Sequence, residues 1–148
     1  MSGNAVPQFV RQANISAIAV TAANTSSEGG GTVATDIFKA FTADATNGSF
    51  VESVLWMPTA TANTTTTATV GRIFISSVTS GATAATNTFL VSEVTLPAVS
   101  ADHATIPVNG IEVAINRHIP AGWTILVENN AAPAGSTQCV AVVFGGDY

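Results

Sequence analysis

The sequence predicts an all-β protein, a β-sandwich of jelly-roll type with about eight antiparallel strands. Apolar and polar residues alternate with a period of two along much of the chain, which is typical of strands with one buried face. Turn-forming pairs such as Asn47-Gly48 and Asn109-Gly110 separate these segments, and prolines lie at their ends. Many short strands with turn signals between them indicate a sandwich or a barrel, and we expect a sandwich.

The clearest alternation lies in residues 109–116, where Ile111, Val113 and Ile115 share one face. Residues 138–144 form a nearly continuous apolar run, as expected of a central strand. The expected strands are residues 15–22, 33–40, 50–57, 69–76, 89–96, 109–116, 123–128 and 138–144.

Two segments allow a second interpretation. Residues 35–43 could form a short helix, because Ile37, Phe38 and Phe41 would then share a face. Residues 59–68 are rich in Thr and Ala, so they form either a long exposed loop or an edge extended along a neighbouring molecule.

A length of 148 residues fits a single domain, which we place at residues 1–148. Chains of this size bury a core without disulfides or metals. Residues 1–12 could act as an N-terminal docking arm, because they carry apolar side chains outside the expected strands.

Charge is unusually scarce. Asp, Glu, Lys and Arg make up 9% of the residues, whereas an ordinary soluble domain has roughly 25%. Charged types are the ones depleted in protein–protein interfaces, so this composition favours a chain that makes large contacts with other proteins. The alternative is a monomer that relies on Thr and Asn for solubility.

Several partners and locations are not expected. Four basic residues against nine acidic ones give no patch for nucleic acid or for an anionic membrane surface. No run approaches the roughly 20 apolar residues of a spanning helix. Residues 1–9 lack the basic segment of a signal peptide, so we expect no secretory leader.

No arrangement of residues indicates catalysis, a metal or a cofactor. His103, His118 and the single cysteine, Cys139, have no recognisable metal-ligand spacing, and Cys139 is expected to be a buried thiol. The motif Gly-x-Ser-x-Gly is absent. Four glutamates lie at outward positions of separate strands, where solvated or interface-facing carboxylates are expected. They are Glu52, Glu93, Glu112 and Glu128. We therefore expect no enzyme.

Trp56 and Trp123 are the only tryptophans, and core packing is the expected role of both. The alternative is that one of them is exposed and stacks on a sugar, as in sandwich lectins.

Short motifs spread over the chain carry a family resemblance. They are Met1-Ser-Gly-Asn-Ala-Val-Pro7, Gly71-Arg-Ile-Phe-Ile75, Ile119-Pro-Ala-Gly-Trp123 and Phe144-Gly-Gly-Asp-Tyr148. Over nearly its whole length the chain resembles small structural proteins of tailed bacteriophages and prophages. In size and composition it is similar to the cement or decoration proteins on the outside of phage capsids.

The resemblance implies a virion protein, made in the host bacterial cytoplasm and displayed in many copies on the capsid surface. It implies binding to the major capsid protein as a trimer or dimer that bridges capsomers and stabilises the head. No functional residue of the family is carried over. The alternative function is a carbohydrate- or receptor-binding module of a phage fibre or tail.

The apolar residues near the two ends of the chain are the candidates for contact with a partner, because termini are ordered only where something holds them. These residues are Val6, Phe9, Val10, Phe144 and Tyr148. The alternative is that the phenylalanines fill the core of the sandwich.

Overall fold

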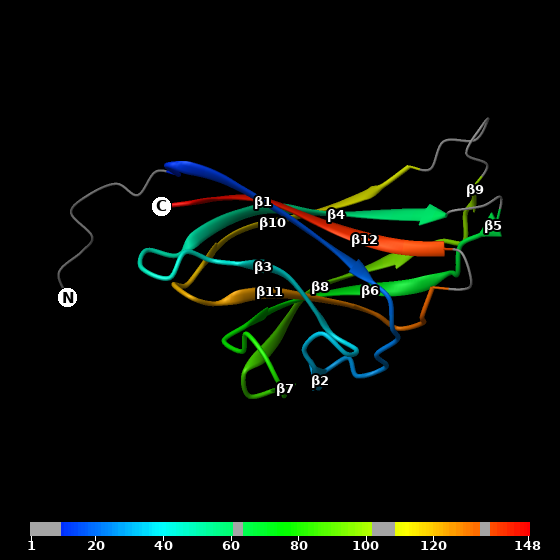
Figure 1. The fold of residues 1–148 in the computed structure, drawn as a ribbon, viewed down its shortest axis with the longest axis horizontal. Helices are drawn as coiled ribbons and strands as arrows, with labels where there is room; N and C mark the ends of the chain where they lie inside the picture. The colour runs from blue at the N-terminus through cyan, green and yellow to red at the C-terminus, as the bar shows by residue number, and fades with distance from the viewer. Residues whose placement is uncertain (1–9, 61–63, 102–108, 134–136) are drawn as a thin grey trace.

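Two four-stranded antiparallel sheets face each other in the computed structural model (Figure 1), which describes residues 10–60, 64–101, 109–133 and 137–148. The first sheet consists of β1 (Gln12–Val20), β12 (Thr137–Asp147), β4 (Ser49–Ala60) and β10 (Ile111–Ile119), in that spatial order. The second consists of β3 (Phe38–Thr42), β11 (Thr124–Asn129), β6 (Thr69–Ser76) and β8 (Thr88–Leu96). The predicted all-β sandwich is therefore confirmed.

The connectivity is that of a jelly roll. Counted along the chain, the eight long strands pair first with eighth, second with seventh, third with sixth and fourth with fifth. The central pairs β12–β4 and β11–β6 then join these hairpin-like pairs into the two sheets. This nested antiparallel pairing is the double Greek key of the jelly roll.

The core lies between the two sheets and is filled by alternate residues of each strand. Trp56 of β4 is fully buried there, together with Val54, Ile125 and Val127. Its ring lies across Gly71 of β6, where an added Cβ would stand 3.0 Å from Trp56 Cζ2. A glycine at this strand position gives the indole room to cross the middle of the sandwich.

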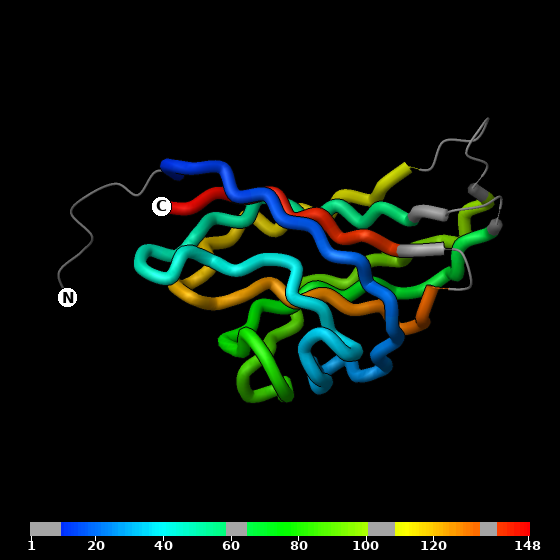
Figure 2. Tube along the Cα trace, viewed as in Figure 1, coloured from blue at the N-terminus to red at the C-terminus, as the bar shows by residue number. Residues whose placement is uncertain are grey.

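The outer faces of the two sheets differ. The loops that carry β2 (Gly31–Thr32) and β7 (Ala82–Thr83) pack on the outside of the second sheet, below it in Figure 1. Beneath them Ile37, Phe74 and Leu126 form a second, fully buried apolar cluster. No described segment crosses the outer face of the first sheet, which is the upper face in Figure 2.

The second predicted strand is displaced. Residues 33–40 were expected to be extended, but the strand spans Phe38–Thr42. Residues 32–37 form a turn instead, in which Asp36 Oδ1 accepts a hydrogen bond from the Thr32 amide and Ala34 adopts a φ of 69°. The alternative of a helix over residues 35–43 is wrong.

Residues 59–68 belong partly to strands. β4 continues to Ala60, and β5 (Thr64–Thr65) pairs with β9 (Ser100–Ala101) of the same chain. The segment is therefore not a loop throughout, and an edge that extends along a neighbouring molecule stays a prediction. Residues 61–63 lie outside the described part.

Candidate interaction surface

The outer face of the first sheet is lined with apolar side chains from three adjacent strands. We call this surface the apolar face. It consists of Ile15, Ala17 and Ala19 of β1, Val140, Val142 and Phe144 of β12, and Leu55 and Met57 of β4.

Strand alternation places these residues outside. Their neighbours along β12, namely Cys139, Ala141 and Val143, are buried in the core, so the residues between them point the other way. The registers align the apolar residues into rows across the sheet. One row joins Ala17, Val142 and Leu55, and the next joins Ala19, Val140 and Met57.

The apolar face is accessible to solvent. Ile15 is 62% exposed, the largest value among the large apolar residues of the described part. The residues of β12 and β4 are half-buried, because they cover one another across the strands. The solvated face of an antiparallel sheet normally carries polar side chains. A face with this composition is instead typical of a contact with another protein.

Charged and polar side chains lie along the β10 side of the apolar face. Glu112 of β10 accepts a hydrogen bond from the Ser53 hydroxyl, and Glu52 is exposed at the β-bulge of β4. His118 of β10 packs on Tyr148, with ring centroids 5.2 Å apart. The β10 side is therefore a polar margin, whereas the edge strand β1 presents Ile15, Ala17 and Ala19.

The structure brings three of the five predicted contact residues together. Val10 is 48% exposed and lies over Gly146, where an added Cβ would come within 2.2 Å of Val10 Cγ1. Phe144 precedes Gly146 by two residues and Tyr148 follows it by two, so all three positions lie on the outer side of β12. Val6 and Phe9 lie outside the described residues.

Ile15, Leu55 and Val142 were not predicted as contact residues. The apolar run at residues 138–144 correctly indicated a central strand. Only its inward half, Cys139, Ala141 and Val143, is buried in the core. The outward residues of this strand are also apolar, and no described segment covers them. Periodicity alone does not show whether another segment covers an outward residue.

A buried ionic cluster lies on the outer side of the second sheet, beneath the loop of residues 21–37. Arg72 Nε donates to Glu93 at 2.7 Å and its Nη1 donates to Glu128 at 3.1 Å. Arg72 Nη1 also donates to the Asn24 carbonyl at 3.3 Å. The guanidinium therefore joins two strands of the sheet to the covering loop.

Glu128 corrects an expectation. It lies at an outward position as predicted, but it is fully buried, because the covering loop excludes solvent. Burial raises the pKa of Glu128 to about 7, and the neighbouring Arg72 opposes this shift. Its Oε2 has no hydrogen-bond partner in the described part of the chain. The pair of Arg72 and Glu128 is thus enclosed, whereas Glu93 on the other side of the guanidinium is exposed.

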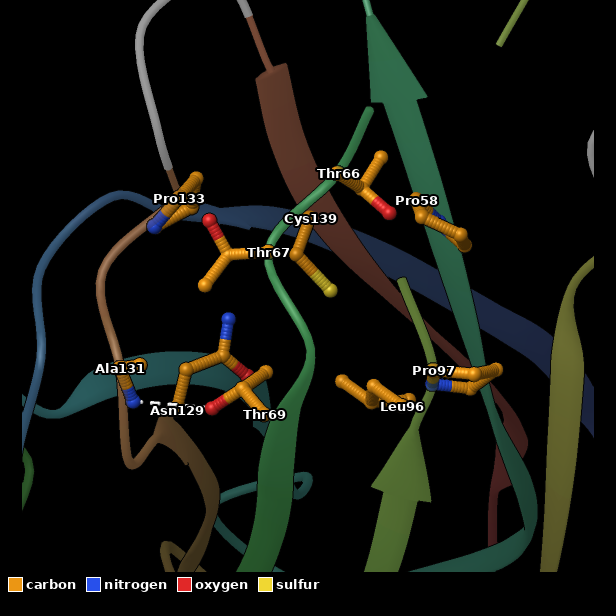
Figure 3. A pocket seen from close by; sticks show the side chains of 10 residues that line it. All are labelled: Pro58, Thr66, Thr67, Thr69, Leu96, Pro97, Asn129, Ala131, Pro133 and Cys139. Atoms are coloured by element: carbon orange, nitrogen blue, oxygen red, sulfur yellow. Dashed lines mark hydrogen bonds between the residues drawn. The ribbon is translucent and has the colours of Figure 1, made fainter. Parts of the chain in front are cut away.

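A small cavity lies at one end of the sandwich, between β4, β6, β8 and β12 (Figure 3). Asn129 and Cys139 point into it from opposite sides. Both amide atoms of the buried Asn129 lack a hydrogen-bond partner of normal geometry among the described residues. The cavity has room for about 20 Å³, which is enough for one water molecule and too little for an organic substrate.

The remaining candidates for chemistry are not brought together. Within the described ranges, no three side chains of His, Cys, Asp or Glu are grouped so that they could hold a metal ion. Cys139 is buried as predicted, and burial raises the pKa of its thiol to about 11. Asp102 and His103 lie outside the described residues.

The two tryptophans occupy different environments. Trp56 is in the core, as expected, so it cannot stack on a ligand. Trp123 is half-buried and packs against the core, and its ring lies nearly parallel to that of Phe89, with ring centroids 6.4 Å apart. Phe89 is 48% exposed, so this pair forms a small aromatic surface at one end of the sandwich.

In the part of the chain that the structure describes, no helix has the length and apolar character needed to cross a membrane. Comparison with protein-family models, with curated proteins and with solved structures found no match to this chain.

Proposed function

We propose that this chain is a non-enzymatic structural protein of a tailed-phage virion, a cement or decoration protein that binds the major capsid protein and bridges capsomers. The observation that supports this proposal best is the uncovered apolar face of the first sheet. An exposed apolar surface of this kind commonly marks a contact with another protein.

The scarcity of charge supports the same function. Side chains of Thr, Ala and Asn lose little conformational entropy when they are ordered, and no buried charge has to be desolvated when such surfaces meet. A capsid presents many identical sites, so a modest gain of free energy at each site adds up over the shell. Binding to the folded, assembled shell then stabilises it by mass action.

The test is deletion of the gene from the phage or prophage that encodes the chain. We expect wild-type particles to contain the protein in stoichiometric amounts by mass spectrometry. Particles without it should release their DNA at a lower temperature, and added purified protein should restore the wild-type temperature. Particles that lack the protein in the wild type, or that are equally heat-resistant after deletion, would contradict the proposal.

The Phe89–Trp123 pair favours one second candidate, a carbohydrate-binding module of a fibre or tail. Stacked aromatic rings with an exposed edge are suited to packing against a sugar. The distinguishing measurement is an array of bacterial surface glycans probed with the wild type and with Trp123→Ala. Binding that the substitution abolishes would favour this function over capsid decoration.

A further inference from the structure

We propose that the apolar face is the contact between two copies of this chain, which pack with their first sheets face to face about a two-fold axis running along β12. This inference rests on the proposed function, because it names the partner of the surface that supports that function. The dimer, rather than the single chain, would then be the unit that bridges capsomers.

The shape of the apolar face is complementary to the same face of a second copy. β12 lies between β1 and β4, so a two-fold axis along β12 places β1 of one copy over β4 of the other. In two of the three rows β1 presents the small Ala17 and Ala19, whereas β4 presents the larger Leu55 and Met57. In the third row the sizes are reversed, because Ile15 of β1 lies level with Ser53 of β4. The small side chains of one copy then receive the large side chains of the other on both sides of the axis.

Charge decides between the two orientations of the axis. An axis along β12 leaves Glu112 of β10 beyond the β1 edge of the other copy, where water and salt screen it. An axis across the strands would place β10 over β10 and bring the two Glu112 carboxylates toward each other. Like charges facing each other in an interface are unfavourable, so the first arrangement is preferred.

The size of the face limits the strength of the dimer. Three strands at a spacing of about 4.8 Å and the five residues from Ile15 to Ala19, at about 3.3 Å each, give a flat footprint of about 14 by 17 Å per copy. Two such footprints amount to about 500 Å² in total, well below the roughly 1,200 Å² of a stable interface. We therefore expect a dimer that dissociates on dilution.

The first experiment measures the mass of the purified full chain by light scattering over about a hundredfold range of concentration. We expect a monomer–dimer equilibrium in the wild type. Ile15→Lys and Ala17→Glu should shift it to monomer, because they place charges on the apolar face at exposed positions of an edge strand. The matched control is Val91→Lys on β8, which is exposed on the second sheet and should leave the dimer unchanged.

A cross-linking experiment tests the position of the axis. In a Cys139→Ala background, Val142→Cys places one thiol near the axis of each copy. Facing sheets lie about 10 Å apart, which is too far for a disulfide but within reach of a short bismaleimide. We expect covalent dimers from Val142→Cys and none from Val91→Cys in the same background.

A wild type that is monomeric at the highest concentration, or a trimer, would overturn the proposal. So would a dimer that resists both charged substitutions while circular dichroism shows that the variants are folded. These results are independent of the particle test: a monomeric protein that still restores heat resistance to deleted particles would refute the dimer and leave the proposed function standing.

Discussion

Arg72 and Glu128 form an ion pair of 3.1 Å on the outer side of the second sheet, and the Glu128 side chain has no exposed surface. Arg72 also bonds the exposed Glu93 and the Asn24 carbonyl of the covering loop. The loop and the sheet are thus held together by one guanidinium. Within the described ranges, one oxygen of the buried carboxylate has no hydrogen-bond partner. Stability at this site should depend on pH.

We expect the free energy of unfolding to fall as pH rises from about 4.5 to about 7 because of Glu128. Its pKa is about 7 in the folded protein, against an ordinary value of 4.5. Between these values the folded state holds a proton that the unfolded state has released, so unfolding becomes easier as pH rises. The contribution of this bound proton to the free energy of unfolding is complete below about pH 4.5, and it is lost as pH rises through about 7. One proton gives a slope of at most about 1.4 kcal/mol per pH unit.

Urea denaturation at several pH values measures this slope, and Glu128→Gln should flatten it. The groups that act on Glu128 are Arg72 of β6, Glu93 of β8 and Asp36 of the covering loop. The matched control is Glu93→Gln, which removes the solvent-exposed partner of the same arginine and should leave the slope in place. An unchanged pH dependence in Glu128→Gln would show that this carboxylate does not titrate as proposed.

Gly71→Ala should lower the free energy of unfolding by about 1–3 kcal/mol, the usual cost of overpacking a core. The added Cβ would stand 3.0 Å from Trp56 Cζ2 and 3.1 Å from Leu96 Cδ1, so the indole has to move. Thermal or urea denaturation checks this. Gly30→Ala is the control, since its Cβ would meet only the Ser26 side chain and a smaller loss is expected. Equal losses in both variants would contradict the packing argument.

Much of the fold could be predicted from the sequence, because alternation reports which side of a strand is buried. Residues 111, 113 and 115 share the inward face, and the apolar run at residues 138–144 is a central strand. The misplaced second strand had a local cause that composition does not show. The Asp36 side chain bonds the Thr32 amide and holds residues 32–37 in a turn.

The surface was harder to predict, because alternation says nothing about what covers the outward residues. Glu128 and Val142 both point outward from central strands, yet loops bury the first and no described segment covers the second. The predicted contacts Val10, Phe144 and Tyr148 have in common that they lie near the two ends of the chain. Their common face follows from the pairing of β1 with β12, a long-range register that one sequence does not display.

The two tryptophans should be distinguishable by fluorescence. Trp123→Phe leaves only the buried Trp56, so we expect blue-shifted emission that acrylamide quenches weakly. Trp56→Phe leaves the half-buried Trp123, whose emission should lie at longer wavelength and be quenched more strongly. Circular dichroism controls for unfolding of the Trp56 variant. Strong quenching of Trp56 in a folded protein would contradict its place in the core.

Cys139 should react with an aromatic disulfide reagent only when the protein opens. Its side chain is buried, and its pKa of about 11 leaves roughly one thiolate in a thousand at pH 8. We expect labelling to be slower by several orders of magnitude than in urea, where the thiol is free. Val91→Cys in the Cys139→Ala background supplies an exposed comparison and should react rapidly without denaturant. If Cys139 labels as fast as Cys at position 91, the end of the sandwich around Asn129 opens readily. The buried position of Cys139 beside the small cavity would then be the wrong description of that end.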